Sequence, residues 1–292
     1  MIILIWVTLI LLAIWFSWYF LRDVLKHKHD LEASSWTKTA LIGFTVNFFD
    51  VLGIGAFAPQ TALLRFTRQT KDKLIPGTMN VANTLPVLIQ AIIFINVIEV
   101  EPLTLITMLL SAMVGAVTGA GIISKLPEDK IRIIMAIALL VTAGFMTANS
   151  LHWIKGGGNS IGLRGPALAV AASVNFILGA LMTAGIGLYA PCMALVFMLG
   201  LSPKVAFPIM MGSCAFLMPP ASFRFIKAGA YNRKASLGMA IPGIAAVLIA
   251  AFIVKSLPLD KLRIIVIGVI VYTSISMFIT VFAKKKNQSQ PH

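Results

Sequence analysis

Charged residues are scarce in this chain of 292 residues. They make up 12% of the sequence, whereas hydrophobic residues make up 59% and the mean hydropathy is +0.93. Soluble domains contain about a quarter charged residues. The composition therefore excludes an ordinary soluble fold, which could not bury so much apolar surface, and it indicates a membrane protein.

Residues typical of catalytic and metal sites are also few. The two cysteines, Cys192 and Cys214, both lie in apolar segments, which favours neither a disulfide framework nor a zinc site. The four histidines lie in predicted loops or the tail, and no phosphate-binding Gly-Lys-Ser/Thr loop occurs. The segment KHKHD (residues 26–30) admits a metal site, but a solvated basic linker explains it better. We therefore expect no enzyme, no metal and no cofactor.

Long apolar runs dominate the sequence. Residues 1–20 contain no charge and are about as long as a membrane-spanning helix needs, and the first charges follow the run, unlike those of a signal peptide. Eight more apolar segments come after it. The 24 Lys and Arg residues lie mostly in the connections between them, which indicates membrane topology rather than nucleic-acid binding. We expect an all-α polytopic membrane protein.

An internal repeat interrupts two of these segments with the same phrase. GIGAFAP (residues 53–59) matches GIGLYAP (residues 185–191) at an offset of 132, and LPEDKIRII from residue 126 matches LPLDKLRII from residue 257 at an offset of 131. Unrelated apolar helices share composition but not Gly and Pro at a fixed period. The sequence therefore contains a duplicated unit.

The distribution of basic residues predicts the orientation of the two copies. If each interrupted segment crossed the bilayer, 13 basic residues would lie on one side and 11 on the other. If each instead turns at its glycines and leaves by the side it entered, 18 lie on the cytoplasmic side and 6 outside. The positive-inside rule favours the second arrangement.

That arrangement is an inverted-topology repeat with one re-entrant, broken helical hairpin per copy, and about seven full crossings plus two hairpins. Many secondary transporters have this architecture. It predicts a plasma (inner) membrane protein with its N-terminus outside and its C-terminus cytoplasmic. The expected units are a first helix with a basic linker (1–37), repeat 1 (38–150), a linker (151–165), repeat 2 (166–283) and a basic tail (284–292).

Each hairpin tip has a chemical consequence. Irregular backbone at membrane depth is tolerated only inside protein or along a watery cavity. Glycine permits the turn, and Pro59 and Pro191 suit the first position of the helix that follows. Two helix N-termini, each with free N–H groups and partial positive charge, would face a common pocket that prefers an anion. The alternative is that the glycines only allow close helix packing.

The residues also carry a family resemblance. FDVLGIGAFAPQTALLRF, LIPGTMNVANTLP and GIGLYAPCMALV resemble the TauE/SafE sulfite exporter family, also called the toluene-sulfonate uptake permease family, over residues 38–280. The resemblance implies a transporter of sulfite, sulfonates or related small organic anions.

The candidate site combines the two tips with a polar stripe on the third apolar segment. Asn and Thr side chains there suit releasable binding of sulfite or sulfonate oxygens, with interhelical hydrogen bonding as the equal alternative. The predicted substrate-binding residues are Gly53, Gly55, Ala58, Pro59, Gln60, Thr61, Asn80, Asn83, Thr84, Gly185, Gly187, Ala190, Pro191 and Cys192.

Asp50 is the candidate coupling residue. It lies just before the first glycine turn in an otherwise uncharged stretch, and burial favours the protonated form of a carboxyl group. Asp50 could then move a proton with the anion. The alternative is that it caps a half-helix or pairs with a basic residue. Met182 stands at the equivalent position of the second copy.

These observations predict a secondary transporter that moves a small anion, sulfite or an organosulfonate, by alternating access. The alternatives are an anion channel built on the same half-helices, and a membrane subunit or scaffold without flux. The expected partners are the bilayer, the anion and, if coupling holds, protons. Neither the direction of transport nor the oligomeric state follows from the sequence.

Overall fold

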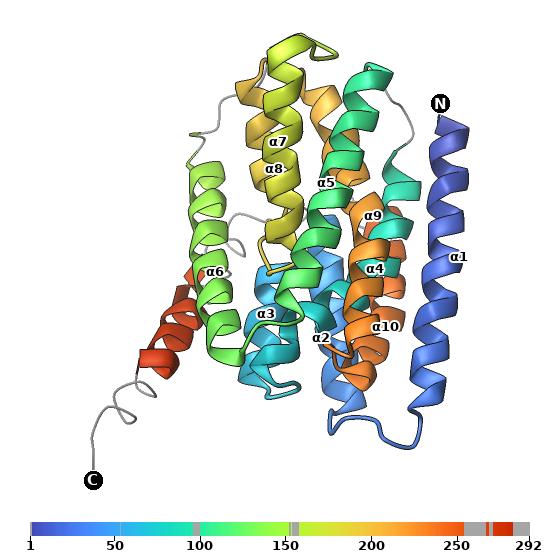
Figure 1. Cartoon of the computed structure of the whole chain (residues 1–292), viewed down its shortest axis with the longest axis vertical. Helices are drawn as coiled ribbons and strands as arrows, with labels where there is room; N and C mark the ends of the chain where they lie inside the picture. Colours follow the sequence, from blue (N-terminus) through green and yellow to red (C-terminus); the bar gives the residue numbers. More distant parts are fainter. Residues whose placement is uncertain are drawn as a thin grey trace.

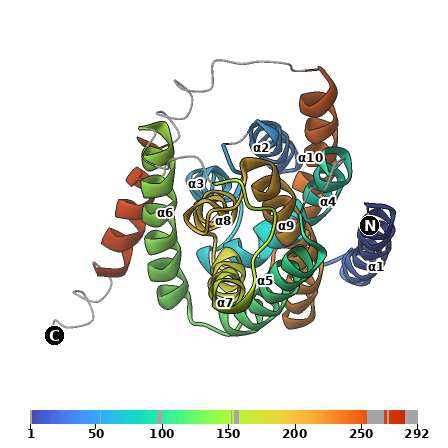
Figure 2. The same ribbon diagram turned by 90° about the horizontal axis from the view of Figure 1, so that it is seen from above.

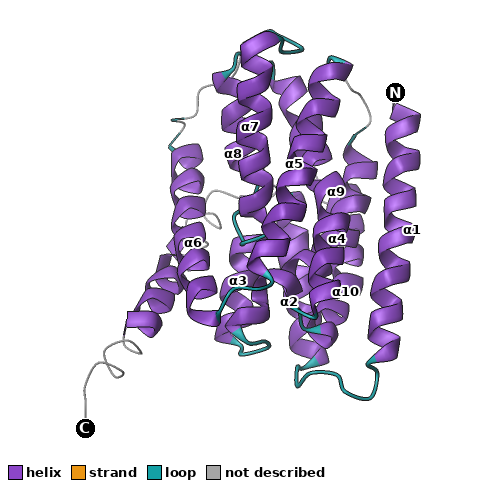
Figure 3. Ribbon diagram, viewed as in Figure 1, coloured by secondary structure: helices purple, strands orange, loops and turns teal. Residues whose placement is uncertain are grey.

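The structure is a computed structural model, and the described residues are helical throughout, apart from turns and an isolated bridge between Ser160 and Leu201 (Figure 3). It describes residues 2–52, 54–95, 100–151, 153, 158–253, 267–268 and 271–282. The elements are α1 (Ile2–Lys26), α2 (Trp36–Val51), α3 (Phe57–Phe66), η1 (Asp72–Leu74), α4 (Ile75–Phe94), α5 (Pro102–Ile123), α6 (Glu128–Ser150), α7 (Gly165–Met182), α8 (Tyr189–Met198), α9 (Pro203–Ala228) and α10 (Arg233–Ile253). A short apolar helix, Val271–Phe282, follows them.

Six helices are long and apolar enough to cross a membrane, which confirms the prediction of an all-helical membrane protein. They lie in α1, in η1 with α4, and in α5, α7, α9 and α10. Five of these are crossings that the sequence predicts, whereas α7 is predicted as one arm of a hairpin. Of the other two predicted crossings, residues 131–151 lie mostly in α6, which is not among the six, and residues 262–283 are described only at 267–268 and 271–282.

Each of the two interrupted segments consists of two helices joined by a turn. The second helix of each pair, α3 or α8, has only 10 residues. Ten residues rise about 15 Å, half of the roughly 30 Å of a bilayer core. Figure 1 shows α2 and α3 together in the lower half of the bundle, and α7 and α8 together in its upper half.

The two helix pairs share details of backbone geometry. After each short helix one residue has positive φ: Arg68 (53°) follows α3, and Gly200 (76°), 132 positions later, follows α8. Several hydrogen bonds also recur at this offset: Ile54 N to Phe49 O and Ile186 N to Leu181 O at the turns, and Gln69 N to Leu64 O and Leu201 N to Val196 O after the short helices. The repeated sequence phrase thus has a repeated local conformation.

Glycines allow the long arm of each pair to pack closely on another helix. A Cβ on Gly43 of α2 would lie 2.3 Å from Met239 O of α10, and one on Gly115 of α5 would lie 1.9 Å from Phe176 O of α7. Small residues permit such contacts between membrane helices.

Seen from above, α1 and α6 lie at opposite edges of the bundle, with α3, α8, α9 and α5 between them (Figure 2).

Candidate functional site

The first break is capped by a buried carboxyl group. Asp50 is 4% exposed, and its carboxyl group accepts a hydrogen bond from the backbone N–H of Ala56, the residue before α3. Gly55 has a φ of 87°, and an added Cβ would meet nothing within 4 Å. Its role is therefore in the turn itself, and the packing alternative does not apply to it. Gly53 lies outside the described residues.

The second break has no carboxyl group at the equivalent place. Met182, which is buried, ends α7, and Gly185 has a φ of 109°. Gly187 has neither positive φ nor a close neighbour. The second glycine of the first phrase, Gly55, thus has positive φ, whereas the second glycine of the second phrase, Gly187, does not, so the two turns are similar without being identical.

The position of the two prolines in the short helices differs from the prediction. The helices begin at Phe57 and Tyr189, so Pro59 and Pro191 occupy the third position and not the first. Proline is tolerated there because the N–H groups of a helix's first turn have no partner within the helix. Ala58, directly before Pro59, and Cys192, directly after Pro191, are both buried. The side chain of Ala190 lies outside the described residues.

The second break approaches the first pair of helices at α4. A Cβ on Gly185 would lie 3.5 Å from Cε of Met79 and 4.0 Å from Oγ1 of Thr61. Thr61 donates to the sulfur of Met79 at 3.0 Å, and Asn80 Nδ2 lies 3.5 Å from the carbonyl oxygen of Thr183. The second break therefore lies against α3 and α4, two residues beyond the end of the first repeated phrase.

A chain of buried amide groups continues from this face. Asn47 of α2 donates to Asn83 Oδ1 at 3.1 Å, and Asn83 in turn donates to Gln60 Oε1. Gln60 donates to the sulfur of Met239 on α10 at 3.2 Å. All three amides are fully buried. The chain joins the broken pair α2–α3 to α4 and α10.

The orientation of the Asn80 amide is determined by its neighbours. Its nitrogen faces two carbonyl oxygens, those of Pro76 at 2.8 Å and of Thr183. Turning the amide over would place oxygen against oxygen, so Oδ1 must point away, and it is buried without a partner. Thr84, the last predicted residue of the stripe, bonds Ser222 of α9 at 2.8 Å. The site thus has an unused hydrogen-bond acceptor in Asn80.

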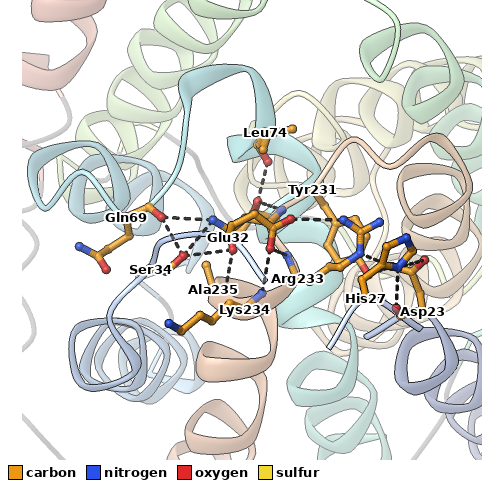
Figure 4. A network of polar contacts seen from close by, with 12 residues as sticks. Asp23, His27, Glu32, Ser34, Gln69, Leu74, Tyr231, Arg233, Lys234 and Ala235 are labelled. Carbon is orange, nitrogen blue, oxygen red and sulfur yellow. Dashed lines mark hydrogen bonds and ion pairs between the residues drawn. The ribbon is translucent and has the colours of Figure 1, made fainter. Parts of the chain in front are cut away.

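A polar network closes one end of the bundle (Figure 4). Arg233, the first residue of α10, contacts Asp23 at 2.7 Å and Glu32 at 3.3 Å. Ser34 Oγ donates to the carbonyl oxygen of Gln69 at 3.1 Å. The loops between α1 and α2, between α3 and η1, and between α9 and α10 therefore lie together.

An ion pair at the other end of the bundle is the counterpart of one in this network. Glu101, just before α5, bonds Arg164, just before α7, at 2.7 Å. Hydrogen bonds from Arg164 and from Thr104 lower the pKa of the Glu101 carboxyl group. At the offset of 132, Glu101 corresponds to Arg233, and Arg164 to Glu32. The same two positions are thus paired at both ends with their charges exchanged.

The structure brings together several predicted site residues of the first copy. Gln60 and Asn83 lie in one polar chain, and Thr61 and Asn80 border the second break. The sequence analysis missed Asn47, which joins that chain. A lone Asn in an apolar helix was the available signal. No group of three or more His, Cys, Asp or Glu side chains that could hold a metal occurs among the described residues.

Comparison with known proteins gives a match to one family. The sequence model of the family described as sulfite exporter TauE/SafE matches residues 1–146, half of the chain. The matched part includes α1 and the first repeated phrase. Searches of curated proteins and of solved structures find no match.

Proposed function

Because the chain belongs to the sulfite exporter TauE/SafE family, we propose that it is a secondary transporter that carries sulfite or an organosulfonate by alternating access. The family and the six apolar helices make it a multi-pass membrane transporter of the sulfite-exporter type. The substrate, the coupling and the mechanism are the proposal. The contacts of the second break with Thr61 of α3 and Asn80 of α4 support it.

The proposed topology is an inverted repeat with two re-entrant hairpins. Two contacts support it: Gln69, after α3, bonds Ser34, before α2, and Ser202, after α8, bonds Ser160, before α7, at 2.9 Å. Each hairpin thus begins and ends at one end of the bundle. In a full crossing the two loops would lie on opposite sides. The 18 to 6 distribution of basic residues favours a cytoplasmic location for the end with Gln69.

The two end ion pairs are the proposed gates. Glu32, in the linker before repeat 1, pairs with Arg233 of repeat 2 at one end, and Glu101 of repeat 1 pairs with Arg164, in the linker before repeat 2, at the other. Both pairs are formed in this structure. Alternating access requires one ion pair to open while the other stays closed. Because the charges of the two pairs are exchanged, each pair has its own charge order.

The proposed substrate site lies where Thr61, Asn80 and Gly185 approach one another. Free N–H groups at the start of α8 offer donors and partial positive charge to an anion. At the start of α3, Asp50 already occupies the corresponding position. An ionised Asp50 repels a nearby anion, whereas a protonated Asp50 carries no charge and does not repel it. We infer that the proton and the anion move together.

Sulfite flux into proteoliposomes under an imposed pH gradient tests this function. The native protein is expected to give saturable flux that follows the gradient, and Asp50→Asn to give flux that ignores it. If Asp50→Asn keeps the gradient dependence, Asp50 is only a cap. Flux that does not saturate indicates a channel, and absence of flux for sulfite and for sulfonates overturns the transport proposal.

A further inference from the structure

A basic groove lies between the ends of α5 and α9. The cavity has a volume of about 740 Å³ and is bordered by Lys125, Arg224 and Lys227, with Ile122 and Leu126 among its apolar residues. A smaller cavity of about 370 Å³ on the α1 side is bordered by Arg22, Lys26 and, again, Lys227. Basic side chains therefore surround the last turn of α9.

The three cations of the larger groove are available for a ligand. All three side chains are exposed, and within the described part of the chain none of them has an ion pair. The guanidinium group of Arg224 lies near α5. A Cβ added to Gly121 would lie 3.7 Å from its Nη2, so the group lies across the groove against α5.

The groove faces away from the proposed transport site. Ser222, two residues before Arg224, is buried and bonds Thr84 at 2.8 Å. Two helical residues differ by about 200°, so Arg224 is on the opposite face of α9. An anion held by Arg224 is therefore outside the route to the two breaks.

The groove also lies at the level of the membrane surface. Two membrane-spanning helices end there, α5 at Ile123 and α9 at Ala228. Ile122 is 57% exposed and offers an apolar wall directly beside the charges. A basic pocket above an apolar wall between membrane helices matches the phosphate and acyl chain of an anionic lipid.

We propose that the groove of Lys125, Arg224 and Lys227 binds the phosphate headgroup of an anionic phospholipid. The Arg224 guanidinium and the two ammonium groups contact the phosphate oxygens, and Ile122 contacts the acyl chain. This site holds the ends of α5 and α9 together beside the lipid. It does not depend on which anion the protein carries.

The test measures retention of phosphatidylglycerol by the full-length protein in detergent, with native mass spectrometry as the readout. Arg224→Ala with Lys227→Ala is expected to weaken phosphatidylglycerol binding about tenfold or more, because each basic residue near an anionic surface contributes several-fold. Phosphatidylcholine retention is expected to stay unchanged. The matched control is Lys71→Ala with Lys73→Ala, which removes the same charge from the loop after α3 and is expected to change binding less than twofold.

Three outcomes overturn the proposal. Equal losses in both double variants mean that net charge alone retains the lipid. No loss in the groove variant means that the groove is not the site. Displacement of phosphatidylglycerol by excess sulfite makes the groove a substrate vestibule. If the double variant fails to fold, Lys125→Gln, an exposed substitution at the end of α5, gives the same comparison with Lys71→Gln as its control.

Discussion

Removing Arg233 is expected to open one end of the transporter selectively. Its side chain is 14% exposed and holds two carboxylates, Asp23 at 2.7 Å and Glu32 at 3.3 Å, whose side chains are 17% and 25% exposed. A hydrogen bond to a charged group contributes about 1.5–3 kcal/mol. Since water reaches these partly buried groups, we expect Arg233→Gln to destabilise the closed end by about 2 kcal/mol, or about 30-fold in the closed-to-open equilibrium.

The two native cysteines provide the assay. Cys192, at the start of α8, is fully buried, so a membrane-impermeant maleimide reaches it only when the protein opens. In a Cys214→Ala background, Arg233→Gln is expected to raise the labelling rate of Cys192 about 30-fold, but only when the reagent is on the side of the membrane where Arg233 and Glu32 lie.

The matched control is Arg164→Gln at the other end. That arginine is 84% exposed, so its ion pair is screened by water and its loss is expected to have a much smaller effect, from the opposite side only. Glu32→Arg combined with Arg233→Glu recreates the charge order of the Glu101 pair and, with Asp23→Asn added to remove the carboxylate that also contacts position 233, is expected to reverse part of the opening. Faster labelling from both sides in Arg233→Gln would mean general loosening and would refute the gate.

Three further predictions concern the turns, the amide chain and the outer ion pair. Gly55→Ala is expected to lower stability by about 1–2 kcal/mol because of its positive φ, whereas Gly187→Ala is expected to be nearly neutral, as measured by thermal unfolding in detergent. Asn83→Ala leaves the buried Gln60 oxygen without its donor and is expected to cost about 1–3 kcal/mol in the same assay, with reduced sulfite flux. The pKa of Glu101 is lowered in the folded protein, so its ion pair contributes stability above the unfolded pKa of about 4.3, and this stability is lost as the pH falls through the lower pKa of the folded protein. Acidification on the side of Glu101 is therefore expected to speed labelling of Cys192 from that side, and Glu101→Gln is expected to abolish this pH dependence.

Local signals predicted the two broken helices, because glycine and proline act on the backbone where they stand. The phrase around Gly55 and the phrase around Gly185 each became a turn with positive φ between two helices. The start of each short helix was predicted two residues late. For α3, the hydrogen bond from Ala56 to Asp50 fixes the turn, and this contact crosses a loop whose shape is not visible in the sequence.

Tertiary contacts account for what the sequence did not predict. Asn47 meets Asn83 only because α2 packs beside α4, and the approach of Gly185 to Thr61 depends on how two distant segments are placed. The ion pair of Glu32 with Arg233 joins positions 201 residues apart. Charge counting predicted that their loops share a side, but it contains no information on which side chains touch.

The two breaks of the repeat differ in charge. At the first break a carboxyl group occupies the helix N-terminus, and at the second break Met182 leaves the equivalent position without charge. A negative charge is favourable at a helix N-terminus, so an ionised Asp50 stabilises the first turn and also repels an incoming anion. The free Asn80 oxygen beside the second break accepts a hydrogen bond but does not neutralise charge. For the proposed transport of sulfite, we expect the ion that carries its own proton, hydrogensulfite, to fit both features, with its hydroxyl group donating to Asn80 and its remaining oxygens facing the start of α8. In the proposed transport cycle, this asymmetry between Asp50 and Met182 would make the first copy the site of proton binding and the second copy the main site of anion binding.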